Sequence, residues 1–189
     1  SVLASNIFRK SDYIKDYNKL NIKREISFNG THHCNEALKM KFTQILENVI
    51  DKNELVLGKS VRVFEKKFAT FVNTNHAISC GNGHDALLLI LKALNISNND
   101  EILVPTNSFI ATALSGSNNG ANIVFLDCNS DNYGIDINDL KKKITKKTKA
   151  LIVVHLFGIP DNINEISKIC KKKNIYLIED ASQAHGAEI

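Results

Sequence analysis

From residue 76 onward, short apolar segments of strand length alternate with longer segments of helical periodicity. The strand-like segments are 76–80, 102–104, 123–126, 151–155 and 175–178. The helix-like segments are 84–95, 108–118, 136–144 and a stretch that begins after Asp161. Strands separated by helices of this length form βαβ units. We therefore predict an α/β fold: a three-layer, mostly parallel sheet with helices on both faces.

Two details of the helices follow from their composition. Residues 84–95 are apolar almost all round, so this helix is expected to be buried. Asp161 precedes a helical pattern and is predicted to cap it, because a carboxylate accepts from the first free N–H groups of a helix.

The first 75 residues have a different pattern. Residues 1–30 are polar and weakly periodic, and we expect a surface arm or an extension that wraps a partner. Residues 35–50 and 60–72 each place apolar side chains on one helical face, which predicts a helical segment over 31–75. Ser60 is the predicted N-cap of the second helix.

Charge and apolar content argue against two classes of partner. The densest basic cluster, 141–147, has no interleaved aromatic residues, so it is interpreted as a solvated face rather than a nucleic-acid surface. The sequence has no run of about 18 apolar residues and no basic-plus-apolar leader pattern. We expect neither nucleic acid nor membrane as a partner.

Cysteine and histidine spacing points to a cytoplasmic protein without a metal. The chain has four cysteines and none forms a C-x-x-C pair, so we expect reduced thiols. His32, His33, Cys34 and Glu36 lack the second half of a metal site, and no metal is expected.

Ligands of parallel sheets bind beyond the carboxyl ends of the strands, and the loop 80–86 lies at such an end. Its sequence is Cys-Gly-Asn-Gly-His-Asp-Ala. Glycines allow close approach of the backbone to a ligand, and the following helix offers free N–H groups and the positive end of its dipole. The loop is thus a candidate phosphate site; the alternative is a tight turn with Asp85 in the first helical turn.

The same loop matches G-x-G-x-x-A, the fingerprint of dinucleotide-binding proteins. That fingerprint requires an acidic residue about 20 positions later, at the end of the second strand, to bind the ribose. Asp100 and Glu101 lie before the strand instead. A dinucleotide-binding oxidoreductase is therefore an alternative, but a second choice.

Three further side chains at strand ends are candidates for chemistry. Asp180 follows a buried strand, and a carboxylate there needs a cation; a protonated pyridine nitrogen, as pyridoxal chemistry requires, is one. The alternative is an Asp that caps the next helix. Phe109 is able to stack on a flat ring or to join the core. His155 is able to contact a ligand or to be a satisfied strand-end histidine.

Taken together, these loops resemble one family, the DegT-type (DegT/StrS) nucleotide-sugar aminotransferases, which are pyridoxal-phosphate (PLP) enzymes of fold type I. The resemblance runs from about Ile26 to the last residue. Its pieces are Leu57-Gly58, Phe64-Glu65, Phe68-Ala69, Asn82-Gly83-His84-Asp85-Ala86-Leu87, Pro105, Phe109-Ile110-Ala111-Thr112, Gly120-Ala121, Val124-Phe125-Leu126-Asp127, Thr148-Lys149-Ala150, Val154-His155-Leu156-Phe157-Gly158 and Ile178-Glu179-Asp180-Ala181-Ser182-Gln183-Ala184-His185-Gly186.

The resemblance implies a set of cofactor contacts. Gly83 and His84 correspond to the loop that holds the phosphate of PLP, although the family commonly has Thr where His84 stands. Phe109 corresponds to the aromatic stacked on the pyridine ring. Asp180 corresponds to the acid paired with the pyridine nitrogen, and Gln183 to the residue beside the ring hydroxyl.

The resemblance also implies that 76–189 is part of a larger cofactor-binding domain, in an amino-terminal piece of an enzyme. No catalytic residue is assigned in this chain: the lysine that forms the Schiff base is expected beyond Ile189, since Lys171–Lys173 lie on the helix before the last strand. The implied reaction transfers an amino group, usually from glutamate, to a nucleotide-linked keto-sugar. The resemblance also implies a homodimer, the usual state in the family, and a role in polysaccharide or glycoconjugate synthesis. Alternatives are a dehydratase of the same family and a non-catalytic relative.

Overall fold

The computed structural model describes the backbone of residues 32–189 and side chains from residue 38 onward. The predicted arm at 1–30 lies outside the described residues. The chain divides into two compact units, one ending at Ser79 and the other comprising Cys80–Ile189.

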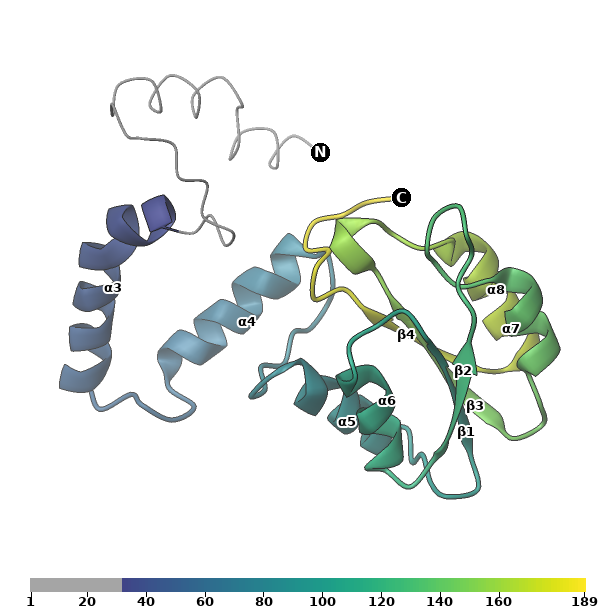
Figure 1. Cartoon of the computed structure of the whole chain (residues 1–189). Coiled ribbons are helices and arrows are strands. Elements are labelled where there is room, and N and C mark those ends of the chain that lie inside the picture. Colours follow the sequence, from purple (N-terminus) through teal and green to yellow (C-terminus); the bar gives the residue numbers. More distant parts are fainter. Residues whose placement is uncertain (1–31) are drawn as a thin grey trace, which may run out of the picture. The chain divides into compact units, whose positions relative to one another are not determined.

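The first unit contains two helices, α3 (His32–Asp51) and α4 (Lys59–Phe71), which confirms the helices predicted at 35–50 and 60–72 (Figure 1). The predicted cap at Ser60 is wrong. The N-cap is Gly58, without a side-chain hydrogen bond, because the helix begins at Lys59 and Ser60 lies inside it.

Residues 76–80 do not form the strand predicted for them. They pair with no strand in the described part of the chain, and Ile78 is 87% exposed. The N–H and hydroxyl of Ser79 donate to the Glu65 carboxylate instead, at 2.8 and 2.6 Å. These two bonds lower the pKa of Glu65, and they attach the segment to α4.

The second unit is built on a four-stranded parallel sheet (Figure 1). Its strands are β1 (Glu101–Pro105), β2 (Asn122–Leu126), β3 (Thr148–Val154) and β4 (Tyr176–Asp180), in the spatial order β2-β1-β3-β4. The predicted mostly parallel sheet is confirmed. Because all strands run the same way, their carboxyl ends meet at one edge.

Helices cover both faces of this sheet, as predicted (Figure 1). On one face lie α5 (Gly83–Ala93) and α6 (Ala111–Ser117), and on the other lie α7 (Ile137–Lys143) and α8 (Ile163–Lys173). Alternating residues of β1 show the division: Ile102 joins the cluster of Leu91 in α5, whereas Leu103 joins the cluster of Leu140 and Ile166. Each such buried Leu or Ile stabilises the fold by about 1.5–3 kcal/mol.

Helix α5 is less buried than its sequence predicts. Leu87 and Leu91 are buried, but Leu89 and Ile90 are 53% and 41% exposed. The prediction of a buried helix is therefore met only in part. The helix contacts the core through one face only, and composition alone does not reveal how many neighbours a helix has.

The cap predicted for α8 is also wrong. The N-cap is Asn162, and Asp161 lies one residue earlier. Its oxygens accept from the backbone N–H groups of Ile135 and Asn162, at 2.8 and 2.6 Å. The carboxylate thus joins the loop before α7 to the loop before α8.

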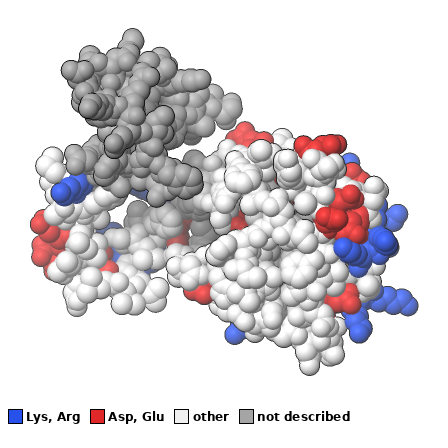
Figure 2. Space-filling model, viewed as in Figure 1, with Lys and Arg blue, Asp and Glu red and all other residues white. Residues whose placement is uncertain are grey.

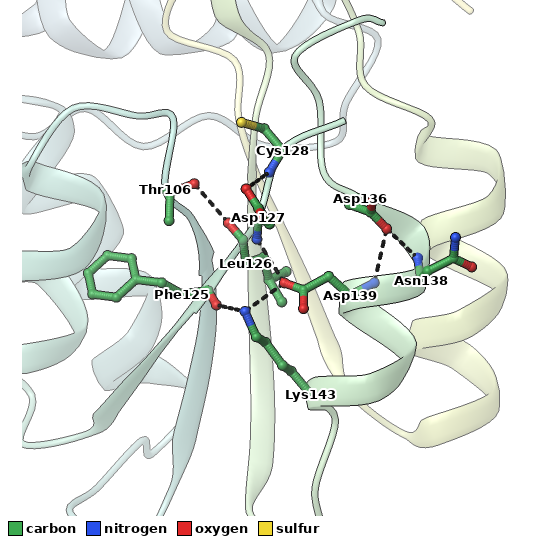
Figure 3. Close-up of polar contacts among 9 residues, drawn as sticks. All are labelled: Thr106, Phe125, Leu126, Asp127, Cys128, Asp136, Asn138, Asp139 and Lys143. Carbon is green, nitrogen blue, oxygen red and sulfur yellow. Dashed lines mark hydrogen bonds and ion pairs between the residues drawn. The ribbon is translucent and has the colours of Figure 1, made fainter. Parts of the chain in front are cut away.

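A second carboxylate connects β2 to α7 (Figure 3). Asp139 accepts from the N–H of Asp127 at 2.8 Å and from the ammonium of Lys143 at 2.7 Å. Lys143 also donates to the carbonyl of Phe125 at 2.8 Å. The backbone hydrogen bond from Asp127, and then Lys143, lower the pKa of Asp139. Helix α7 is thereby held against the carboxyl end of β2.

Basic side chains of the 141–147 cluster have acidic neighbours. Lys141 pairs with Glu165 at 2.9 Å, and Lys143 pairs with Asp139. Figure 2 shows positive and negative side chains mixed at the right of the view, where α7 and α8 lie in Figure 1. Such mixing favours the interpretation as a solvated face. Among residues 32–189, no helix has the length and apolarity needed to cross a bilayer.

Candidate cofactor site

A pocket of about 430 Å³ lies at the carboxyl ends of β3 and β4, beside the first turns of α5 and α6. All five residues predicted to bind a cofactor line it: Gly83, His84, Phe109, Asp180 and Gln183. The other lining residues are mainly apolar or small, namely Asn82, Leu87, Ala111, Thr112, Val154, Leu156 and Ser182. The structure therefore brings together residues that are up to 100 positions apart (83 to 183).

The first turn of α5 presents free hydrogen-bond donors at this pocket. Asn82 is the N-cap: its side-chain oxygen accepts from the N–H of Asp85 at 2.9 Å, and its amide donates to the Asp85 carboxylate at 3.0 Å. The N–H of Ala86 donates to the carbonyl of Asn82 and makes the first backbone hydrogen bond of the helix. Within the described residues, the N–H groups of Gly83 and His84 have no acceptor. Such a pair at a helix N-terminus is suited to an anion.

The ring of His84 is engaged elsewhere. Its Nε2 lies 3.2 Å from the amide nitrogen of Asn118, at the end of α6. Its Nδ1 lies 3.6 Å from the Asp85 carboxylate, so both ring nitrogens have polar neighbours within the protein. His84 therefore offers a ligand its backbone N–H, whatever its side chain.

Phe109 is an exposed aromatic at the pocket surface. Its side chain is 77% exposed, which rules out the alternative that it belongs to the core. The carbonyl of Phe109 accepts from the N–H of Thr112, in the first turn of α6. An aromatic fixed to a helix start, with its ring accessible, is able to stack on a planar ligand.

Asp180 ends β4 with a half-buried carboxylate. One oxygen, Oδ1, accepts from the N–H of Ser182 at 3.1 Å and from its hydroxyl. No helix follows in 181–189, so the alternative that Asp180 caps a helix is wrong; it stabilises a turn instead. In the described part of the protein, Oδ2 has no donor, which leaves one oxygen for a ligand cation.

Gln183 is fixed through its amide oxygen, which accepts from the backbone N–H of Phe157 at 2.7 Å. The nearby His155 does not line the pocket. It is buried, its Nδ1 accepts from the N–H of Asp161, and its Nε2 contacts Glu179. Of the two interpretations of His155, the structure supports the satisfied strand-end histidine.

Asn82 and Ser182 are site residues that sequence reasoning did not select. Each has a recognisable local signal. Asn82 and Asp85 have the spacing of a capping box, and Asp180 and Ser182 have the spacing of a turn closed by an Asp side chain. Both residues orient the groups that face the pocket.

The acid required for dinucleotide binding is misplaced. Glu101 lies at the amino end of β1, where it accepts from the hydroxyl of Thr145. The opposite end of β1 is Pro105. Among the described residues, no group of three His, Cys, Asp or Glu side chains is arranged to hold a metal ion.

A parallel α/β sheet that brings a helix N-terminus with free N–H groups, an exposed aromatic and a strand-end carboxylate into one pocket has the chemical groups suited to a phosphorylated aromatic ligand. Comparison with known proteins gives the particular family. Residues 36–189 match the family model "DegT/DnrJ/EryC1/StrS aminotransferase family", and the chain belongs to this family.

Individual relatives agree with this assignment. A dTDP-3-amino-3,6-dideoxy-alpha-D-galactopyranose transaminase of Aneurinibacillus thermoaerophilus is 39% identical over 86% of this chain and 45% of its own length. The crystal structure of S. venezuelae DesV with a ketimine intermediate superposes with a TM-score of 0.80, at 34% identity, over 82% of this chain and 42% of that one.

A third relative catalyses a different reaction. It is a GDP-4-keto-6-deoxymannose-3-dehydratase, whose structure contains a trapped PLP-glutamate geminal diamine. Its TM-score is 0.71 at 31% identity, over 78% of this chain and 40% of that one. The chain spans less than half the length of each of these relatives.

Proposed function

We propose that the pocket binds PLP through the five predicted residues. The N–H groups of Gly83 and His84 would hold the phosphate, Phe109 would stack on the ring, Asp180 would pair with the pyridine nitrogen, and Gln183 would contact the ring hydroxyl. The observation that carries this proposal is that two free N–H groups and an available carboxylate oxygen share one pocket. Its volume of about 430 Å³ suits a small cofactor.

We further propose the reaction: transfer of an amino group, from glutamate, to a nucleotide-linked keto-sugar. Support comes from relatives named as transaminases of dTDP- and UDP-linked sugars. When bound, PLP supplies an electron sink, and a cationic pyridine nitrogen strengthens it. Within this chain, the contribution is to bind and orient the cofactor and to hold a negative charge at Asp180.

Several finer features belong to the same proposal. They are a catalytic lysine supplied by sequence beyond Ile189, a homodimer, a cytoplasmic location and a role in polysaccharide synthesis. The division into an arm (1–30), a helical segment (31–75) and a cofactor domain (76–189) is also proposed. The complete gene product is the protein together with whatever sequence flanks these residues.

A second candidate is sugar dehydration with the same cofactor. The observation that favours it is the similarity to the GDP-4-keto-6-deoxymannose-3-dehydratase. Both reactions use the same cofactor contacts, so the residues of this pocket do not separate them. A non-catalytic relative would retain the pocket and lack both activities.

The test uses the complete gene product with added PLP. We expect a visible absorbance band, and borohydride reduction should attach the cofactor to a lysine that mass spectrometry locates beyond Ile189. Incubation with glutamate and a nucleotide-linked keto-sugar should give an amino sugar, whereas a dehydratase gives a deoxy product without the amine. A protein that remains colourless and does not bind PLP would refute the proposal.

A further inference from the structure

The turn after β3 contacts two polar residues of the pocket, Asp180 and Gln183. The N–H of His155 donates to the carbonyl of Asp180 at 3.0 Å. Two residues later, the N–H of Phe157 donates to the side-chain oxygen of Gln183 at 2.7 Å. The first contact joins the residue after β3 to the last residue of β4, and the second joins the loops that follow these two neighbouring parallel strands.

The conformation of this turn is unusual for its sequence. Phe157 has φ 57° and ψ 18°, in the left-handed region that bulky residues rarely adopt. Its side chain is 82% exposed, so packing of the ring does not account for the conformation. Left-handed non-glycine residues concentrate at functional sites, where a surrounding contact holds them. Two hydrogen bonds hold the turn here: the N–H of Ile159 donates to the carbonyl of Leu156 at 3.0 Å and closes the turn itself, and the N–H of Phe157 donates to Gln183 and ties the turn to the pocket.

Gly158 brings the two loops close together. Its φ is +80°, and a Cβ added to it would lie 3.2 Å from the backbone carbonyl oxygen of Gln183. The neighbour is backbone, not the end of a flexible side chain. A larger residue at 158 would therefore push the turn away from Gln183.

The hydrogen bond from the N–H of Phe157 determines the orientation of the Gln183 side-chain amide. A backbone N–H is a donor, so only the amide oxygen of Gln183 is able to meet it. The amide nitrogen, with its two hydrogens, is then left for the pocket that Gln183 lines. A side chain that is otherwise free to flip is thus presented to a ligand as a donor.

We propose that the left-handed turn at Phe157–Gly158 is a positioning element that fixes the Gln183 amide with its nitrogen toward the ligand. Phe157 contributes its backbone, not its ring, and is not a catalytic residue. This inference rests on the proposed function, in which the Gln183 amide donates to the ring hydroxyl oxygen of PLP and favours its ionised form.

The test compares three variants of the complete gene product. Gln183→Met removes the amide, and Gly158→Ala displaces the turn. Gly120→Ala is the matched control, because Gly120 has nearly the same φ (+82°) and a Cβ there makes only ordinary contacts, at 3.7 Å or more. Gly120 precedes β2, at the opposite end of the strands from the pocket. It therefore carries the same backbone penalty without touching the site.

Two properties of bound PLP are measured: its dissociation constant and the pH midpoint of its absorbance change. We expect Gly158→Ala and Gln183→Met each to raise the dissociation constant about tenfold, the value of one hydrogen bond. Both should move the pH midpoint upward, and Gly120→Ala should change neither. Combining Gly158→Ala with Gln183→Met should add nothing, because both remove the same contact.

Hydrogen exchange of the Phe157 amide gives a readout independent of the cofactor. Protection in the wild type and its loss in Gln183→Met are expected. Equal protection in both, independent effects in the double variant, or a Gly158→Ala variant that matches Gly120→Ala would overturn the inference while leaving PLP binding intact. A wild-type protein that does not bind PLP would overturn the proposed function and this role together.

Discussion

The Nδ1 atom of His155 accepts a hydrogen bond from the backbone N–H of Asp161 at 3.2 Å. An acceptor nitrogen carries no proton, so Nε2 holds the hydrogen of the ring and donates to the carboxylate of Glu179 at 3.0 Å. The ring is only 5% exposed. Both ring nitrogens are therefore hydrogen-bonded, and the ring links the end of β3 to β4 and to the loop before α8.

Replacing His155 by Leu should destabilise the protein. The N–H of Asp161 would lose its buried acceptor, which costs about 1–3 kcal/mol in the free energy of unfolding. Urea denaturation of the complete gene product measures this cost. His76→Leu serves as the control, because His76 is exposed and its replacement should change stability by no more than about 0.5 kcal/mol. Equal midpoints for the two variants would contradict the assigned role.

A proline at position 83 should weaken PLP binding through the loss of one N–H. Asn82 is extended (φ −167°, ψ 176°), as a residue before proline must be, and position 83 is the first of α5, where proline is tolerated. Loss of a donor to a charged phosphate costs about 1.5–3 kcal/mol, so we expect the dissociation constant to rise at least tenfold.

Gly83→Ala is the matched control for this experiment. It keeps the N–H, and its Cβ would lie 3.7 Å from the hydroxyl of Ser182, an ordinary contact. Equilibrium titration with PLP should separate the two variants. If Gly83→Pro binds PLP as tightly as Gly83→Ala, the N–H of Gly83 does not hold the phosphate.

Phe109→Ala should weaken PLP binding without destabilising the fold. Aromatic stacking contributes about 0.5–1.5 kcal/mol, so the dissociation constant should rise about threefold to tenfold. Because the side chain is 77% exposed, the urea midpoint should stay constant. Phe109→Tyr should retain affinity. Tyr133→Ala, which removes an aromatic ring that is 67% exposed and outside the pocket, should not affect PLP binding. A similar loss in Tyr133→Ala would point to a non-specific effect.

The lowered pKa of Asp139 predicts a pH-dependent contribution to stability. A carboxyl group whose folded pKa lies below its unfolded value stabilises the protein above the unfolded pKa of about 3.9, and this contribution is lost as the pH falls through the folded pKa. Asp139→Asn should therefore cost up to about 1 kcal/mol at neutral pH, after allowance for solvent screening. The difference from wild type should shrink below about pH 4.

Urea midpoints measured across this pH range test the Asp139 prediction. Glu165→Gln is the comparison. Glu165 and Lys141 also form an ion pair, at 2.9 Å, but their side chains are more exposed, at 44% and 52%. Glu165→Gln should cost no more than about 0.5 kcal/mol. A pH-independent cost for Asp139→Asn would exclude the ionised carboxylate as its source.

Periodicity predicted most of the α/β unit, because the burial of each element and the direction of the chain both follow from local sequence patterns. Runs such as Ile102–Leu103–Val104 are buried on two faces and need apolar residues throughout. The segment 76–80, His-Ala-Ile-Ser-Cys, was also predicted to be a strand, yet it pairs with no described strand. Whether a strand forms depends on a partner, and sequence patterns do not contain the partner.

Caps and contacts between distant residues were harder to predict. Ser60 and Asp161 are residue types that favour N-caps. The observed N-cap lies two residues before Ser60 in one helix and one residue after Asp161 in the other. The residue chemistry of the Gly-rich loop and of Asp180 pointed to phosphate and to a cation. Gln183 was selected only by resemblance, because its orientation depends on the N–H of Phe157, 26 positions away.

The position of β4 at the border of the sheet has a consequence for whatever chain is added there. In the described residues β4 pairs with β3 alone, so its other side carries unpaired N–H and C=O groups. When these residues are expressed alone, this unpaired edge of the sheet is a template for aggregation. A strand that joins it in the same direction would end beside Asp180, and the residue at its carboxyl end would be delivered to the pocket by backbone pairing alone.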